Sequence, residues 1–152
     1  ALENYVNTEL IPRAVCSVLL SVDLENLSVN SDCVCLIILT ALCGLDHGET
    51  LAIVHPGVMD IMRKEKRGKL LQYARRVWNI TIENEEQAID EAIERTENFF
   101  RSIGKKTRLS EYGIGDDVIE TIVERFKQRG WNVGEHGIVT PEKTRLILEK
   151  VK

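Results

Sequence analysis

Apolar residues recur every three or four positions along most of this chain, which is the spacing of one face of an α-helix. The clearest stripes lie between residues 70 and 78 and between residues 88 and 103, where polar and charged residues occupy many of the intervening positions. We therefore expect a chain built from successive helices. The predicted segments are 10–24, 33–43, 49–62, 70–78, a long helix within 81–104, 116–130 and 141–151.

Several of these helices carry recognisable end signals. Thr140 and Pro141 are a capping residue followed by a first-turn proline, and Gly104 and Gly130 are typical helix ends. Pro56 is followed by a glycine inside the segment 49–62. Because proline removes a helical hydrogen bond, we expect a kink or a short break there.

Evidence for strands is thin. The short stretches 131–133 and 137–139 are flanked by glycines and are typical of connectors. No internal repeat or low-complexity segment interrupts the chain, whose 152 residues suffice for one buried core. The sequence therefore predicts an all-α fold, a multi-helix bundle that forms a single helical domain over residues 1–152.

Composition restricts the class of function further. The net charge is −4, which does not favour a basic face for nucleic acid, and the one basic run, 63–67, is interrupted by Glu65 and predicts a solvated helix end. The longest apolar run, 33–43, is about half the ~20 residues that span a bilayer. The first residues lack the charged and apolar regions of a signal peptide. We therefore expect a cytoplasmic protein with reduced cysteines, no nucleic-acid partner and no membrane association.

Three segments, in order, carry a family resemblance. Residues 47–56 read HGETLAIVHP, residues 69–80 read KLLQYARRVWNI, and residues 99–114 contain FFRSIG followed by TRLSEYGI. Together they resemble the C-terminal helical domain of the iron-containing (group III) alcohol dehydrogenases, in particular the NADPH-dependent butanol and aldehyde reductase branch. The resemblance covers residues 39–152, whereas residues 1–38 match the family poorly.

The resemblance implies a metal site with His47 as one ligand. His47 matches the last histidine ligand of the family, and Cys33 stands fourteen residues earlier, where the family has another histidine. The family's remaining ligands, an aspartate and a histidine four residues later, would fall before Ala1. Iron or zinc is the divalent metal that this resemblance implies. Complete relatives also use NAD(P), which they bind in an N-terminal nucleotide-binding domain that this sequence does not contain.

Other residues give weaker or negative indications. The set Cys33, Cys35, Cys43 and His47 offers an alternative, a small zinc-binding module, although residues two apart on a helix face different ways. The glycines at 113–115 and 134–137 are too sparse for a nucleotide-phosphate turn, so no cofactor-binding residue is assigned. His55 is expected to be structural.

The expected function is that of a metal-binding helical domain of an iron-type alcohol dehydrogenase or aldehyde reductase, inactive as this chain alone. Its expected partner is the N-terminal nucleotide-binding domain, or a second copy bound through the same docking face. A non-catalytic interaction or remnant domain is the second hypothesis, because a face that no longer meets its domain would remain apolar and associate.

Overall fold

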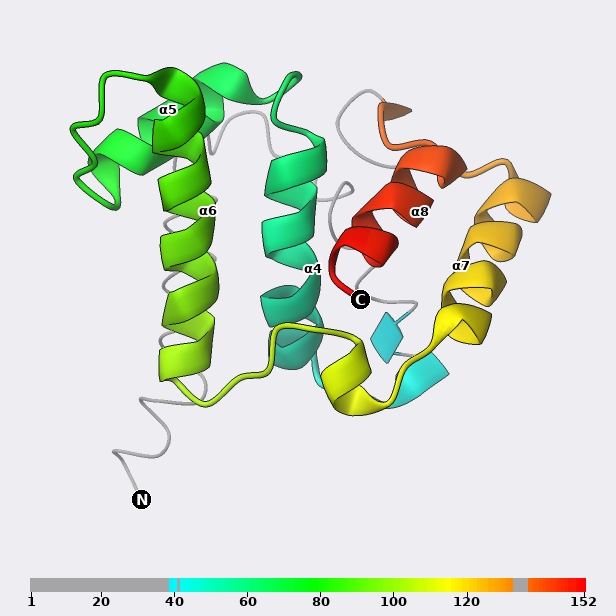
Figure 1. Ribbon diagram of the computed structural model, residues 1–152. Helices are drawn as coiled ribbons and strands as arrows, with labels where there is room; N and C mark the ends of the chain where they lie inside the picture. The colour runs from blue at the N-terminus through cyan, green and yellow to red at the C-terminus, as the bar shows by residue number, and fades with distance from the viewer. Residues whose placement is uncertain (1–38, 41, 133–136) are drawn as a thin grey trace.

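Helices dominate the part of the chain that the computed structural model describes, which is residues 39, 40, 42–132 and 137–152 (Figure 1). Val139 makes an isolated β-bridge, and the predicted all-α class is confirmed. Within these residues, no helix is both long and apolar enough to cross a membrane. The elements are α4 (His47–Ile61), α5 (Arg67–Arg76), α6 (Glu85–Ser102), the short 3-10 helix η2 (Ser110–Tyr112), α7 (Asp116–Arg129) and α8 (Pro141–Lys150).

Local sequence signals set most helix ends. Thr140 caps α8, where its hydroxyl accepts a hydrogen bond from the Lys143 amide, and Pro141 occupies the first turn as predicted. Asn84 caps α6 in the same way. Gly130 ends α7 with a φ of 62°, a left-handed conformation that glycine adopts without steric cost.

Helix α4 lies at the centre of the fold, with α6 on one side and α8 on the other (Figure 1). It continues as one helix through Pro56, so of the two expected outcomes, a kink or a short break, the break does not occur. Ala52, Pro56 and Gly57 are all buried, and this packing compensates for the hydrogen bond that proline cannot make. Gly57 permits a close approach to α8, because a Cβ atom there would lie 2.5 Å from Cγ1 of Val151.

A large apolar cluster joins α4 to α7 and α8. The Phe126 ring is fully buried in it and meets Trp131 edge to face, with 5.9 Å between ring centroids. This large cluster forms the main core of the described residues. Its buried members are Leu39, Leu51, Ile53, Val54, Met62, Leu109, Ile114, Ile119, Ile122, Val123, Phe126, Val139, Ile147, Leu148 and Val151.

A second, small cluster lies between α5 and the N-terminal half of α6. Tyr73 and Thr96 are buried in this region and their hydroxyl oxygens are 2.7 Å apart, while Thr96 donates to the Ala92 carbonyl, also at 2.7 Å. Since that bond uses the Thr96 proton, Tyr73 is the donor to Thr96. The Trp78 ring covers Tyr73 edge to face at 6.4 Å. The buried members of the small cluster are Met59, Leu70, Tyr73, Ala74, Ile80, Ala88, Ile89 and Ala92.

Two predicted helices fall wholly or mainly outside the described residues. The segment 10–24 is one of them, and only the end of the segment 33–43 is described. At that end, Leu39, Thr40, Leu42 and Cys43 are helical, and Leu39 is fully buried in the large cluster. The described residues of this segment therefore agree with the predicted buried helix.

Candidate functional site

His47 occupies the first position of α4, and the residue is exposed. Side chains next to His47, not its own ring, cap the first turn of α4. Asp46 Oδ1 accepts a hydrogen bond from the Glu49 amide at 2.8 Å, and Glu49 Oε2 accepts one from the Asp46 amide at 3.1 Å. This reciprocal capping box fixes the first turn. The sequence contains the signal for this capping box, an aspartate followed three residues later by a glutamate. The apolar pattern alone predicts a helix start at Glu49, two residues later than observed. The imidazole therefore projects from a fixed backbone at the edge of the fold.

The surroundings of His47 are rich in negative charge. Asp46 and Glu49 lie on either side of it in sequence, and Lys105 Nζ approaches Asp46 Oδ2 at 3.6 Å. Burial raises the pKa of the Tyr112 hydroxyl, and the nearby charges of Glu49 and Asp46 raise it further. An excess of carboxylates beside an imidazole favours a cation over an anion at this end of α4.

The second predicted ligand, Cys33, lies outside the described residues. Among the residues that are described, no group of three His, Cys, Asp or Glu side chains could hold a metal ion. Catalytic zinc-type sites usually keep three protein ligands. The described part of the chain thus offers one exposed imidazole and, by itself, does not form a metal centre.

Cys43 is poorly suited to the alternative zinc module. Its side chain is half-buried, and burial, with a smaller contribution from the charge of Asp117, raises the pKa of the thiol. Zinc requires the thiolate, which a raised pKa disfavours. Residues 44–46 are not helical, so Cys43 and His47 do not share a continuous helix despite their spacing of four. His55, expected to be structural, lies half-buried within α4.

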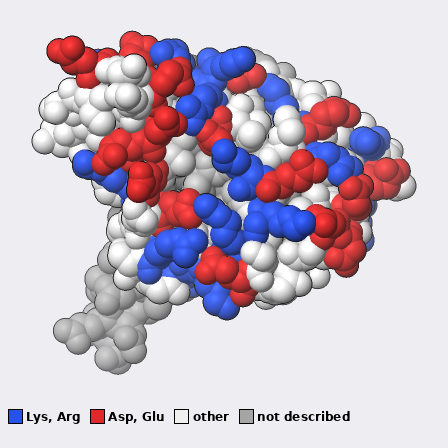
Figure 2. All heavy atoms as spheres, in the orientation of Figure 1, with Lys and Arg blue, Asp and Glu red and all other residues white. Residues whose placement is uncertain are grey.

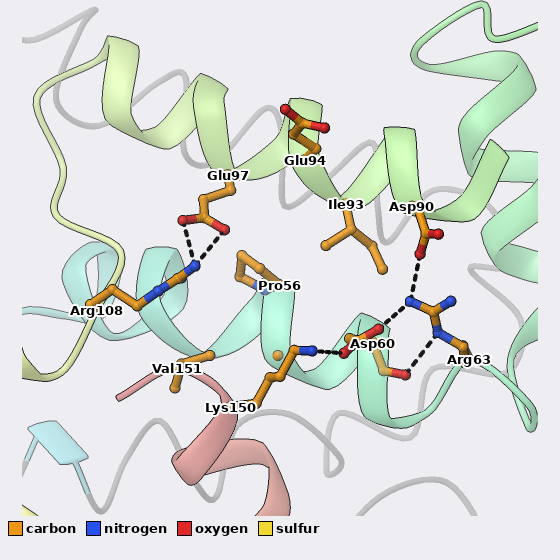
Figure 3. A pocket seen from close by; sticks show the side chains of 11 residues that line it. Pro56, Asp60, Arg63, Asp90, Ile93, Glu94, Glu97, Arg108, Lys150 and Val151 are labelled. Atoms are coloured by element: carbon orange, nitrogen blue, oxygen red, sulfur yellow. Dashed lines mark hydrogen bonds and ion pairs between the residues drawn. The ribbon is translucent and has the colours of Figure 1, made fainter. Parts of the chain in front are cut away.

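A groove of about 270 Å³ lies over the middle of α4, between α6 and α8 (Figure 3). Its floor includes Pro56 and Gly57, and its walls carry charged side chains from both flanking helices. In the same orientation as Figure 1, the space-filling view shows lysine and arginine side chains interleaved with carboxylates rather than gathered by sign (Figure 2). The further lining residues are Asp60, Arg63, Asp90, Ile93, Glu94, Glu97, Arg108, Lys150 and Val151.

Ion pairs cross this groove in a connected chain. Lys150 of α8 contacts Asp60 of α4 at 2.7 Å, and Asp60 contacts Arg63 in the turn after α4. Arg63 then reaches α6, where it contacts Asp90 at 2.8 Å (Figure 3). It also contacts Glu86 of α6 at 3.1 Å. Arg67 joins from α5 by contacts with Glu86 and with Glu85. We call this set the Arg63 network: Asp60, Arg63, Arg67, Glu85, Glu86, Asp90 and Lys150.

The charge states in the Arg63 network follow from these contacts. Burial raises the pKa of the Asp60 carboxyl, but hydrogen bonds from Lys150 and Arg63 outweigh it and leave the pKa below its usual value. Hydrogen bonds from Arg67 and Arg63 lower the pKa of the Glu86 carboxyl. The basic run 63–67 predicted only a solvated helix end. Its role in this network leaves little local signal, because the partners of Arg63 and Arg67 on α6 lie far away in the chain.

Comparison with protein families matches residues 26–148 to the description "Fe-containing alcohol dehydrogenase family, C-terminal". The NADPH-dependent aldehyde reductase YqhD of Escherichia coli strain K12 is 44% identical over 115 residues, which is 75% of this chain and 30% of that protein. The NADP-dependent alcohol dehydrogenase 3 of Entamoeba histolytica is 47% identical over 89 residues, which is 59% of this chain and 22% of that protein.

Solved structures give the same picture of the fold. A substrate- and cofactor-free form of the aldehyde reductase YqhD from Escherichia coli aligns with a TM-score of 0.74 and 42% identity, over 78% of this chain and 31% of that one. The NADH-dependent butanol dehydrogenase A of Thermotoga maritima aligns at 0.68 with 26% identity, over 77% of this chain and 31% of that one. The chain therefore spans about a third or less of the length of each of these relatives.

Proposed function

The chain belongs to the Fe-containing alcohol dehydrogenase family, and we propose that it acts as the C-terminal helical part of an NAD(P)-dependent aldehyde reductase or alcohol dehydrogenase. The observation that carries this proposal is the 44% identity with an NADPH-dependent aldehyde reductase across three quarters of the chain. The exposed His47 at the capped start of α4 is compatible with it, since its imidazole is not enclosed by the aliphatic side chains of either cluster.

In this proposal His47 is one ligand of a divalent metal, iron or zinc, and Cys33 is a second. When bound, such a metal acts as a Lewis acid on the oxygen of the aldehyde or alcohol. The contribution of this chain is to hold His47 at a fixed helix start, beside the carboxylates of Asp46 and Glu49. The remaining ligands are an aspartate and a histidine four residues later on one helix. They come, with the NAD(P)-binding surface, from a nucleotide-binding domain that ends in that helix, and this domain is the proposed partner of this chain.

Residues 1–152 by themselves, with one described ligand, should not catalyse hydride transfer. We expect no NADPH oxidation above background when the purified 152-residue chain is mixed with NADPH, Zn(II) or Fe(II) and short aldehydes. Adding a separately expressed nucleotide-binding domain of a close relative should restore measurable turnover. Turnover by the chain alone, at a rate typical of enzymes, would contradict the proposed division of labour.

Metal binding gives a readout that does not depend on turnover. Co(II) added to the reconstituted pair should produce visible absorption from a bound ion, and His47→Ala should abolish most of it. His136→Ala is the matched control, because it removes a histidine that matches no ligand of the family. Equal Co(II) spectra from both variants would remove His47 from the metal site while leaving the family membership intact.

A further inference from the structure

Among the described residues, helix α4 contributes more buried apolar residues to the large cluster than to the small cluster. Residues Leu51, Ile53 and Val54 of α4 enter the large cluster, whereas Met59 is the one buried residue of α4 in the small cluster, as far as the described residues go. The small cluster also relies on three alanines, which bury little area each. Apolar burial therefore attaches α5 and the N-terminal half of α6 to α4 less firmly than it attaches α8.

The Arg63 network supplies much of the remaining attachment. Arg63 keeps only 26% of its side chain exposed and Asp60 only 17%, so the centre of the network is largely shielded from water. Its outer members are much more open, with 61% of the Asp90 side chain and 50% of the Glu86 side chain exposed. Shielded pairs resist screening by salt, whereas exposed pairs are weakened by it.

The network also crosses the groove rather than lining one side of it. Asp60 is held from α8 by Lys150 and from the turn by Arg63, which in turn reaches α6 (Figure 3). A second bridge over the groove, from Arg108 to Glu97 at 2.9 Å, lies nearer the C-terminal end of α6. Charged bridges with water-accessible space between them are a weaker connection than the close packing of Gly57 against Val151, which joins α4 to α8.

We propose that α5 and the N-terminal half of α6 form an opening unit, held against the end of α4 by the ion pairs of Arg63 with Glu86 and Asp90 as a latch, and that salt or acid releases it while α7 and α8 stay folded. This unit spans roughly residues 67–93 and coincides with the small cluster. Local opening of such weakly attached segments is a general property of folded domains. Release leaves the start of α4 in place, because His47 lies at the other end of the helix, roughly 20 Å away along its axis.

The direction of the acid effect follows from the carboxyl groups. The pKa values of Asp60 and Glu86 are lowered in the folded chain, so their stabilisation is present above the unfolded pKa of about 4 and is lost as the pH falls below it. The charged groups that face these carboxyls are Arg63 of the turn, Arg67 of α5, Glu85 and Asp90 of α6 and Lys150 of α8. Protonation of the carboxyls leaves the cations without partners and favours opening.

Hydrogen exchange on the intact 152-residue chain tests this latch. Raising NaCl from about 0.05 M to about 1 M shortens the screening length to about 3 Å, and it should speed exchange of amides in residues 67–93 by about fivefold. Amides of α7 and α8 should change by less than about twofold. Protection factors at about pH 3 and at pH 7, corrected for intrinsic exchange, should show the same contrast between the two regions, because the stabilisation by Asp60 and Glu86 is lost only below about pH 4.

Two substitutions separate the latch from a general loss of charge. Arg63→Gln should produce the fast exchange of residues 67–93 already at low salt and abolish its salt dependence. Arg145→Gln is the control, because Arg145 pairs with Glu120 across α7 and α8 and takes no part in the network. The proposal would be overturned if all helices exchanged at one common rate at both salt concentrations. An equal response of both regions to Arg63→Gln would also overturn it. None of these outcomes depends on metal or on turnover, so they are distinguishable from a failure of the proposed function.

Discussion

The two sides of α4 differ in what holds them. On one side, α7 and α8 bury large aliphatic and aromatic side chains around Phe126, with Gly57 allowing the helices to come close. On the other side, α5 and α6 combine small residues, a buried pair of hydroxyls and a fringe of ion pairs. The contrast teaches that one helix can anchor two regions of a fold by different forces, and that these regions should respond differently to solvent.

The largest expected effect comes from the apolar side. Phe126→Ala removes a fully buried ring and should lower the free energy of unfolding by about 3–5 kcal/mol, because the surrounding side chains only partly fill the space. Urea denaturation followed by circular dichroism measures this loss. Leu146→Ala is the control, since that side chain is 50% exposed and should change stability by less than about 0.5 kcal/mol. Similar losses for both would mean that the large cluster is not the main core.

A glycine pair sharpens the comparison of the two flanks. Gly57→Ala places a Cβ atom 2.5 Å from Val151 Cγ1 and 3.2 Å from the Ile147 carbonyl, so we expect a net loss of about 1–3 kcal/mol despite the better helix propensity of alanine. Gly68→Ala in α5 meets no atom within 4 Å and should gain about 0.5 kcal/mol. Thermal melts of the two variants should therefore move in opposite directions. A gain from Gly57→Ala would indicate that α4 and α8 can separate easily.

The smallest expected effects come from two buried threonines. Thr96 and Thr144 are both fully buried, but Thr96 is hydrogen-bonded to Tyr73 and Ala92, whereas the Thr144 hydroxyl meets no partner among the described residues. Thr96→Val should cost about 1–2 kcal/mol, and Thr144→Val should be neutral or stabilising by up to about 1 kcal/mol. Chemical denaturation resolves this difference in sign. Equal losses would show that the hydroxyl pair gives the small cluster no special support.

Much of the fold could be predicted from local patterns. The ends of α6, α7 and α8 follow capping residues and glycines that act within a few positions, so Thr140, Gly104 and Gly130 were informative. Of the kink or short break expected at Pro56, the break does not occur, because tertiary packing, which no local pattern reports, holds the helix together there.

The candidate sites also differ in how far the sequence alone could predict them. His47 could be singled out from a sequence resemblance, and its exposure is consistent with a ligand, but its assignment as a metal ligand stays a prediction together with that of Cys33. The groove and the Arg63 network left no local signal. Lys150 and Asp60 are ninety residues apart, and neither charge differs in kind from the other surface charges of the chain. The packing of α8 against α4 brings Lys150 to Asp60, and the position of α6 brings Asp90 to Arg63.

The two tryptophans of this chain fall one on each side of α4, with Trp78 beside Tyr73 and Trp131 beside Phe126. Trp131 also lies under the guanidinium of Arg129, at 4.6 Å from the ring centroid. The molecule thus carries two tryptophan fluorophores in different surroundings. Replacing either indole by phenylalanine would leave a single tryptophan whose emission wavelength and quenching, excited selectively over tyrosine, follow one half of the protein alone.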